Sequence, residues 1–443
     1  MEPIKVFFLV FLILMVMRAP MYLCLLGSSL LYIYLTPQLS MMTAMNKMMN
    51  APNSFTLLAV PFFIFAGQVM NNGGVTDRIF GFAKKMIGHW SGGLAYVNVL
   101  SSLIFSGISG SALADVGGLG MIEIKAMRDE KYDDDLTLGV TGASSTVGPI
   151  IPPSIPFVIY GAMANVSIGA LFMAGLGPGV VLCIVLCIYI YIIAKKRKYP
   201  RHAKASGREK WKAFLEALPA LMFPAIMLGG IWTGWFTPTE SAMFSVLYGT
   251  IVSCFVYREM DIRKLPSLAV ATVRQVGPSI AVVVGASLFA WVMTYEQIDK
   301  VVVELILSVT SNRYVILLLI NLILLILGMF IEVVAAIMIM LPILTPLMAI
   351  ANISPIHMGV ILVLNMMIGL LTPPVGMSLY MLSSASKRSF GDVVKMVSPW
   401  LIPLFIALAM VTYIEPITMF LPGLFGYVSV SYTHLTLPTN SRV

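Results

Sequence analysis

The chain has 443 residues, of which 59% are hydrophobic and only 11% are charged. Its mean hydropathy is +0.93, and apolar runs of membrane-spanning length extend from end to end, which excludes a water-soluble fold. The net charge of +8 comes from 28 basic and 20 acidic residues. Because the basic residues lie in short loops between apolar runs, they indicate membrane orientation and not a nucleic-acid surface. We predict an all-α polytopic membrane protein that resides in a lipid bilayer and binds no nucleic acid.

Ten apolar segments have the length and composition of membrane-spanning helices. They cover residues 3–18, 20–35, 55–71, 136–163, 168–195, 213–233, 238–257, 277–294, 355–381 and 393–415. Two further apolar stretches, at about 93–130 and 314–350, have polar or Gly-rich centres, and we predict that each forms a re-entrant hairpin. Amphipathic segments at 75–90 and 297–312 precede the hairpins, either as interfacial helices lying flat or as ordinary connectors.

Side chains that support redox or phosphate chemistry are scattered. The four cysteines lie in apolar runs and the four histidines are dispersed, so no metal or haem ligand set forms. The sequence contains no G-x-x-x-x-G-K-[ST] motif, and thus no phosphate loop with which to hydrolyse ATP. If the protein pumps a solute, it must therefore use an ion gradient or a partner.

Basic residues orient the predicted topology, because short cytoplasmic loops collect Lys and Arg. The densest cluster begins at Lys195 and continues through 201–212, which we interpret as a cytoplasmic basic linker between two halves, 1–200 and 213–425. Each half contains five spans. Since five is an odd number, the two halves must have opposite orientations in the membrane.

A shift of 221 residues aligns the two halves. It places 147–153 over 368–374 and Gly107 over Gly328. One register therefore relates the hairpins and the proline-containing spans, as an inverted repeat requires. We expect the first hairpin to open to the cytoplasm and the second to open to the outside.

Two successive prolines interrupt one apolar span in each half. Pro152 and Pro153 lie within 136–163, and the equivalent pair within 355–381 ends at Pro374. Proline lacks a backbone donor and clashes with the preceding turn, so both spans must break near the middle of the bilayer. Unpaired backbone at that depth is tolerated only where it is buried in protein or lines a cavity. Paired broken helices favour a transporter site, where freed carbonyls coordinate Na⁺ and half-helix amino ends attract an anion.

The hairpin centres supply further polar groups. Ser106, Ser109 and Ser111 offer hydroxyls beside glycines in the first hairpin, and Gly328 offers close backbone approach in the second. Small residues also let membrane helices pack, but their repetition in one register favours a binding role.

Carboxylates within the apolar segments are few. Asp115, Glu123, Glu240 and Glu332 are the candidate intramembrane carboxylates. An ionisable group at such depth costs about 2.5–3.5 kcal/mol. Each is therefore either a functional group or a hydrogen-bonded or interfacial structural residue.

Several separated motifs occur in the order found in one family, and with them the sequence resembles the large membrane subunit of the tripartite ATP-independent periplasmic (TRAP) transporters of the dicarboxylate and sialic acid type. The likeness covers about residues 1–425, and its marks include the stretches 109–115, 148–154, 236–240 and 371–376. The resemblance implies an elevator-type, Na⁺-coupled importer of an organic anion in the bacterial inner membrane. It also implies two partners, which are a small four-helix membrane subunit and a periplasmic substrate-binding protein.

The resemblance implies ligands as well. One Na⁺ would bind oxygens of Ser106, Ser109, Gly148, Ile151 and Pro153, and a second those of Gly328, Gly369, Thr372 and Val375. The organic anion would lie between the two ions, near Ser111, Ser154 and Pro374.

Two other functional classes remain open from the residues alone. An ion channel could use the hairpins as a selectivity filter, although paired inverted repeats suit alternating access better. An intramembrane enzyme would need a nucleophile–base or metal constellation, and the serines have no His or paired Asp beside them in the sequence. The polar, Ser/Thr-rich segment 429–443 differs from the rest, and we interpret it as a non-native or disordered tail.

Overall fold

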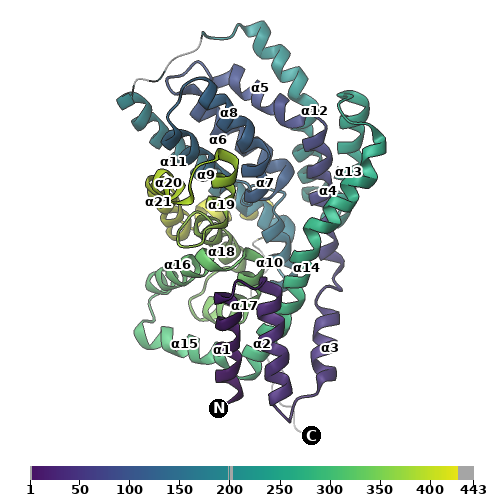
Figure 1. Cartoon of the computed structure of the whole chain (residues 1–443), viewed down its shortest axis with the longest axis vertical. Helices are drawn as coiled ribbons and strands as arrows, with labels where there is room; N and C mark the ends of the chain where they lie inside the picture. Colours follow the sequence, from purple (N-terminus) through teal and green to yellow (C-terminus); the bar gives the residue numbers. More distant parts are fainter. Residues whose placement is uncertain (1, 198, 200–202, 428–443) are drawn as a thin grey trace.

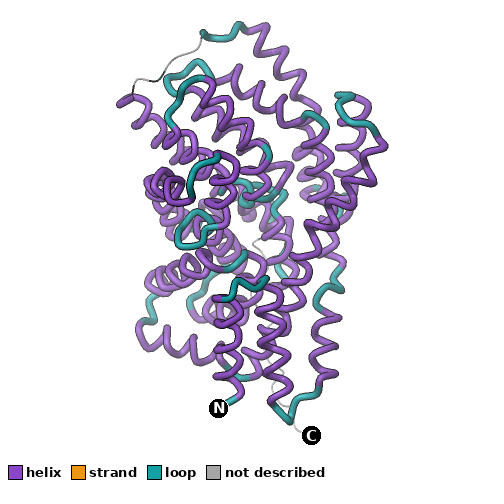
Figure 2. Tube along the Cα trace, viewed as in Figure 1, coloured by secondary structure: helices purple, strands orange, loops and turns teal. Residues whose placement is uncertain are grey.

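A computed structural model describes residues 2–197, 199 and 203–427. Throughout these residues the secondary structure is helical, with turns and loops between helices and no strand (Figures 1 and 2). The predicted tail at 429–443 and the first two residues of the predicted linker lie outside the described residues.

The first half of the chain runs from the amino terminus to the basic cluster. Its helices are α1 (Pro3–Val16), α2 (Met21–Leu35), α3 (Met41–Asn50), η1 (Phe55–Leu58), α4 (Ala59–Asn72), α5 (Val75–Ile87), α6 (Gly93–Ser109), α7 (Ala112–Gly117), α8 (Leu119–Asp129), α9 (Asp134–Ser145), α10 (Ile155–Ala164) and α11 (Ile168–Arg197).

The second half repeats much of this order. Its helices are α12 (Gly207–Trp232), α13 (Pro238–Ile251), η2 (Val252–Val256), η3 (Ile262–Lys264), α14 (Leu265–Tyr295), α15 (Ile298–Val309), α16 (Arg313–Phe330), α17 (Val333–Ile350), α18 (Pro355–Gly369), α19 (Met377–Ser386), α20 (Phe390–Val397), η4 (Ser398–Trp400), α21 (Leu401–Tyr413) and α22 (Pro416–Leu424).

Eight helical segments among the described residues are long and apolar enough to cross a bilayer. They include α16 and α17, which the sequence assigned to a single hairpin, while α1 and α2 are shorter apolar helices. The predicted span at 277–294 is too short, because α14 begins at Leu265 and continues through the internal Pro278. Helices α3 and α22 were not predicted, since both lie outside the predicted spans, hairpins and amphipathic segments.

Both predicted helix breaks are present. Helix α9 ends at Ser145 and α10 begins at Ile155, while α18 ends at Gly369 and α19 begins at Met377. The peptide bonds Pro152–Pro153 and Pro373–Pro374 are cis. The proline pairs therefore interrupt the helix at matching places in the two halves, as the 221-residue register predicts.

Each hairpin packs against the broken helix of the other half. Helix α7, in the first hairpin, packs against α19 of the second broken helix, and α17, in the second hairpin, packs against α10 of the first broken helix. The amphipathic helices α5 and α15 lie at opposite ends of the molecule (Figure 1). This arrangement fits an inverted repeat whose hairpins and broken helices form one interlocked core.

A second group of helices flanks that core. Helix α14 packs against α2, α4 and α17, and α13 packs against α4 and α12. In Figure 1, α4, α12, α13 and α14 run along one side of the molecule, beside the hairpins and broken helices. The hairpins and broken helices therefore lie beside a second layer of helices, α4, α12, α13 and α14, which we call the helical wall.

A half-buried ion-pair network ties the core together at the beginning of α9. Asp134 accepts hydrogen bonds from Arg128 Nε at 2.8 Å and from Arg388 Nε at 2.7 Å, and Arg128 also donates to the Ser386 carbonyl at 3.0 Å. Burial alone would raise the pKa of Asp134, but the bonds and charges of Arg128 and Arg388 hold it below its ordinary value of 3.8. The network joins α8, α9 and the α19–α20 loop.

We expect Arg128→Met to lower the free energy of unfolding by about 1–2 kcal/mol at pH 7, because it removes charge-assisted bonds that the Asp134 carboxylate keeps. A carboxylate with a depressed pKa stabilises the fold above its unfolded pKa, and this contribution disappears as the pH falls through the folded value. The difference between Arg128→Met and the wild type should therefore shrink below about pH 4 in thermal unfolding. Lys212→Ala is the control, since the Lys212–Glu216 pair is exposed at 77% and 56% and should contribute little.

Candidate functional site

The tip of the first hairpin, at Gly110 between α6 and α7, contacts the first helix break, between α9 and α10. Gly110 links α6 to the Ser111 cap of α7 and has a left-handed φ of +58°. A Cβ atom at Gly110 would lie 2.3 Å from the Pro153 carbonyl oxygen. Only glycine permits both this backbone conformation and this approach, so the tip contacts the peptide groups that the break has freed.

The second hairpin makes the corresponding contact with the second break. A Cβ atom at Gly369 would lie 2.6 Å from the Gly328 Cα, and the Gly376 N–H donates to the Met329 carbonyl at 3.4 Å. The carbonyl oxygens of Leu370 and Thr372 would each lie 3.1 Å from a Cβ at Gly376. Backbone oxygens therefore converge beside a hairpin tip in the second half as well.

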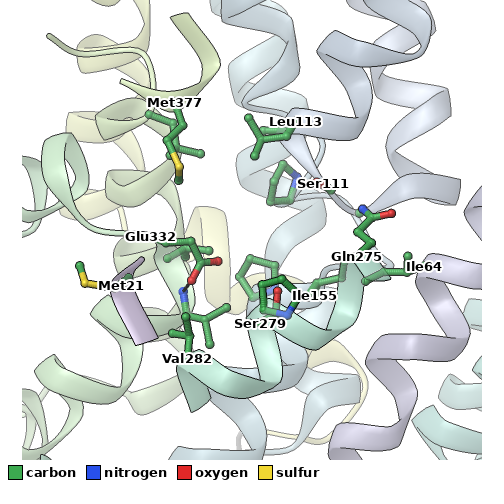
Figure 3. A pocket seen from close by; sticks show the side chains of 18 of the residues that line it. Met21, Ile64, Ser111, Leu113, Ile155, Gln275, Ser279, Val282, Glu332 and Met377 are labelled. Carbon is green, nitrogen blue, oxygen red and sulfur yellow. Dashed lines mark hydrogen bonds between the residues drawn. The ribbon is translucent and has the colours of Figure 1, made fainter. Parts of the chain in front are cut away.

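A cavity of about 380 Å³ lies where these tips and breaks meet the helical wall. Its lining includes Ser111 of the first tip, Glu332 of the second tip, Leu370 of the second break, and Gln275 and Ser279 of α14. Figure 3 shows Glu332 on one side of the cavity and Ser111 and Gln275 on the other. Most of the remaining lining is apolar, which is typical of a site for an organic molecule.

The predicted first Na⁺ ligands surround the first tip. The Ser109 hydroxyl is buried and has no hydrogen-bond partner among the described residues, and Pro153 presents its carbonyl to the adjacent Gly110. Ser106 donates to the Ser102 carbonyl at 2.5 Å, and its own carbonyl accepts from the Gly110 N–H at 3.3 Å. An unsatisfied buried hydroxyl in a tip whose next residue contacts a carbonyl oxygen suits a small cation.

The other predicted first-site residues, Gly148 and Ile151, lie in the turn between α9 and α10. A Cβ at Gly148 would be 3.2 Å from the Ser145 carbonyl oxygen and 3.6 Å from the Ser111 carbonyl oxygen. The turn is thus wrapped tightly against the hairpin tip.

The predicted second ligand set gathers at the second break. Thr372 is buried, and its hydroxyl donates to the Ile368 carbonyl at 2.8 Å, which leaves the hydroxyl lone pairs available to a cation. Gly328 and Gly369 are in backbone contact, and Val375 lies in the same turn. The structure therefore brings this set together, although the site itself remains a prediction.

Of the three predicted substrate contacts, Ser111 is among the residues that line the cavity. Ser154 is fully buried, and its hydroxyl donates to the Pro149 carbonyl at 2.5 Å and accepts from the Phe157 N–H at 3.2 Å. It caps α10 and does not line the cavity. Pro374 is exposed and also lies outside the lining.

The candidate intramembrane carboxylates separate into three environments. Glu332 lines the cavity. Asp115 and Glu123 are 3% and 1% exposed, and Asp115 Oδ1 and both Glu123 carboxylate oxygens have no hydrogen-bond partner among the described residues. Glu240 matches the structural alternative, because it is an exposed residue that forms a capping box with Thr237 at the start of α13. Its motif stabilises a helix terminus and places no carboxylate at a buried site.

Buried amides in both halves were missed in the sequence. Asn98 accepts from Ser144 at 2.7 Å, and Asn365 donates to Asn321 at 2.6 Å. Ser144 and Asn365 are 221 residues apart, so the two bonds fasten equivalent pairs of helices, α6 to α9 and α16 to α18. The 221-residue register aligns Ser144 with Asn365, but this one polar match did not by itself indicate a buried hydrogen bond.

The cavity-facing residues of α14 were missed for another reason. Gln275 and Ser279 are one helical turn apart, Gln275 just before and Ser279 within the predicted span 277–294. The Gln275 side-chain oxygen accepts from Gln68 of α4 at 2.8 Å. Nothing in the sequence shows that this face of α14 lies opposite the hairpin tips.

The fold and the site together define a class, that of a polytopic permease with a central cavity between hairpins and broken helices. A family model described as "Tripartite ATP-independent periplasmic transporter, DctM component" matches residues 8–417. The chain belongs to this family of TRAP transporter large permeases, which are multi-pass proteins of the bacterial inner membrane and not enzymes.

Three relatives show how close the match is. The chain is 46% identical to the sialic acid TRAP transporter large permease protein SiaM of Vibrio cholerae, over 90% of this chain and 94% of that protein. It is 42% identical to the sialic acid TRAP transporter permease protein SiaT of Haemophilus influenzae, over 94% and 68% of the two chains. The C4-dicarboxylate TRAP transporter large permease protein DctM of Pseudomonas aeruginosa is 38% identical over 86% and 89%.

Two solved structures share the fold. The YdaH transporter of Alcanivorax borkumensis superposes with a TM-score of 0.64 at 13% identity, covering 93% of this chain and 98% of that one. MtrF of Neisseria gonorrhoeae gives a TM-score of 0.59 at 12% identity, covering 84% and 83%. At such low identity the likeness concerns the arrangement of helices alone.

Proposed function

We propose that this permease imports an organic anion, a sialic acid, a C4-dicarboxylate or a related carboxylate, and that the inward movement of Na⁺ drives the import. The observation that carries the proposal is the convergence of two hairpin tips, two helix breaks and one cavity, with the Ser109 hydroxyl left unsatisfied beside the tip. Relatives named for sialic acid and C4-dicarboxylate transport support the substrate range.

Bound Na⁺ would supply the positive charge that the cavity lining lacks. Among the described residues that line it there is no Lys, Arg or His. Na⁺ at the Ser109 and Thr372 sites would provide positive charge beside an anion, and each ion that enters gains about 2.3 kcal/mol per 100 mV of membrane potential. Two or more ions could therefore drive a mono- or dianion against its gradient.

The movement we propose is that of an elevator. The interlocked hairpins and broken helices would slide as a unit against the wall that includes α4, α13 and α14, and carry the cavity across the membrane. The small four-helix membrane subunit would enlarge that wall, and a periplasmic substrate-binding protein would deliver the anion. An ion channel is the alternative that the experiments must separate.

Proteoliposomes that contain the permease and both partners test this proposal. We expect Na⁺-dependent uptake that saturates at a low turnover and gives no single-channel currents. Ser109→Ala and Thr372→Ala should each raise the Na⁺ concentration for half-maximal uptake by about threefold to tenfold, since a lost hydroxyl ligand costs about 1 kcal/mol. Ser308→Ala is the control, because Ser308 is an exposed residue of α15. Unchanged Na⁺ dependence in both variants would remove the site assignment, and uptake without Na⁺ would remove the coupling.

A further inference from the structure

A second cavity lies where the amphipathic helix α5 meets the beginning of α12, and it shares no described lining residue with the central cavity. Its volume is about 410 Å³. The two helices pack side by side at one end of the molecule (Figure 1), and residues 203–205 of the basic linker also line the cavity. Because the linker is rich in Lys and Arg, we predict that this end faces the cytoplasm.

The charged groups of this second cavity are mostly positive. Its described lining includes three lysines, which are Lys84, Lys85 and Lys204, and one acidic residue. That residue, Glu209, lies 3.5 Å from Lys85 Nζ, and Lys84 Nζ lies 2.8 Å from Glu130 Oε1. Lys204 has no acidic partner in the described part of the chain. Two carboxylates therefore compensate three ammonium groups, which leaves one positive charge for a ligand.

Two further polar groups of the cavity favour an anion. Glu209 Oε2 accepts from the Ser206 N–H at 2.8 Å in the capping box of α12, so this oxygen already has a partner. His89 also lines the cavity, and its buried Nδ1 has no hydrogen-bond partner among the described residues. This nitrogen can donate when it carries the ring hydrogen. A phosphate group would satisfy both the uncompensated ammonium and the imidazole nitrogen.

Exposed apolar side chains border the cavity. Met86, Trp90 and Trp211 are 37%, 48% and 62% exposed, and each lies within two residues of a lining residue. Trp211 stacks on Phe214 with ring centroids 5.5 Å apart, and Phe214 lies 6.0 Å from Phe82 of α5. Tryptophan is enriched where lipid headgroups meet acyl chains. The surroundings therefore suit a ligand with an anionic head and an apolar chain.

We propose that this cavity binds the phosphate headgroup of an anionic phospholipid of the phosphatidylglycerol class. Lys85 and Lys204 would donate to the phosphate oxygens, and the acyl chains would lie beside Trp90 and Trp211. Helix α5 follows α4 of the wall and precedes α6 of the first hairpin. The lipid would therefore fasten this connecting helix to α12, whichever solute the permease carries.

Quenching of tryptophan fluorescence by brominated lipids tests the proposal, because Trp90 and Trp211 lie beside the cavity. The full-length permease, purified in detergent with its small membrane subunit, is titrated with brominated phosphatidylglycerol and separately with brominated phosphatidylcholine. We expect phosphatidylglycerol to quench at a lower mole fraction. Lys85→Gln and Lys204→Gln should each weaken its binding about fivefold, the effect of one basic residue near an anionic membrane surface. Quenching by phosphatidylcholine should not change.

Two further variants separate a built site from general surface charge. Gly81→Leu keeps every charge but fills the cavity, because Gly81 lines it and an added Cβ meets nothing within 4 Å. It should also weaken phosphatidylglycerol binding. The double variant of Lys195→Gln with Lys212→Gln removes two exposed lysines outside the described lining. It should change binding far less than the double variant of Lys85→Gln with Lys204→Gln. Each variant is melted to confirm that it is folded.

Three results would overturn the proposal. Equal quenching by the two lipids in the wild type would show no preference for an anionic headgroup. Equal losses in the two double variants would show diffuse attraction and no site. Inorganic phosphate, added without lipid, is the third probe. If it raises the melting temperature and this rise needs Lys85 and Lys204, the ligand is a soluble phosphate compound and not a lipid.

Discussion

Gly110→Ala should abolish Na⁺-driven uptake and lower the free energy of unfolding by about 2–4 kcal/mol. Gly110 has a φ of +58°, and its added Cβ would lie 2.3 Å from the Pro153 carbonyl oxygen. Backbone cannot yield as a flexible side chain does, so the tip must move away from the helix break. That movement would separate the Ser109 hydroxyl from the carbonyl group proposed to share its Na⁺.

Gly234→Ala is the matched control for this variant. Gly234 also has a left-handed φ, of +74°, but an added Cβ would meet nothing within 4 Å. Gly234→Ala should therefore lower the free energy of unfolding by only about 1–2 kcal/mol, the cost of a left-handed backbone conformation for alanine. It should leave the Na⁺ dependence of uptake intact. Thermal unfolding and uptake measured over a range of Na⁺ concentrations check both variants. Equal losses in the two would show that backbone strain, and not the collision with Pro153, explains the Gly110 effect.

Gly369→Ala should have the second largest effect, with uptake lowered about tenfold or more and stability lowered by about 1–3 kcal/mol. Its φ is ordinary, but the new Cβ would lie 2.6 Å from both the Cα and the carbonyl carbon of Gly328. The second tip would be pushed off the second break, where Thr372 and the backbone oxygens are proposed to bind Na⁺. The measurements are the Na⁺ affinity of the purified permease and its melting temperature.

Gly229→Ala provides the comparison for Gly369→Ala. Gly229 lies inside helix α12, and an added Cβ would meet nothing within 4 Å. Alanine favours the helix over glycine by about 1 kcal/mol, so this variant should be as stable as the wild type or slightly more stable. A Gly369→Ala variant that transports as well as Gly229→Ala would mean that the tip and the break do not need to touch.

The helix breaks were predictable because their cause is local. A proline in a helix removes its own donor and collides with the preceding turn whatever surrounds it, and two in succession leave no helical alternative. The turn between α6 and α7 was predictable for a related reason, since Gly110 supplies a conformation that other residues avoid. The repeat register added the pairing of these features, which single motifs could not.

Other parts of the site were not predicted. Glu240 was a candidate intramembrane carboxylate, although the local pattern Thr237-x-x-Glu240 is a capping-box signature and the structure places it at an exposed helix terminus. Ser154 was predicted as a substrate contact, and its hydroxyl donates to Pro149 and accepts from Phe157 within the turn that it closes. Gln275 reads as an isolated polar residue, and its place at the cavity appears only because α14 packs against α4 and α17. For Gln275 the deciding partner is distant in the sequence, and for Ser154 it depends on how the chain turns.

The sequence by itself determined that this protein lies in a membrane, that its two halves repeat, and where two of its helices break, because hydropathy and proline geometry act over one or a few turns. Only the tertiary structure decided which side chains share the cavity and that Ser111 and Glu332 occupy its two ends. The physical reason is that a cavity is bounded by surfaces from several helices at once, and their mutual packing, not any local preference, sets which faces meet.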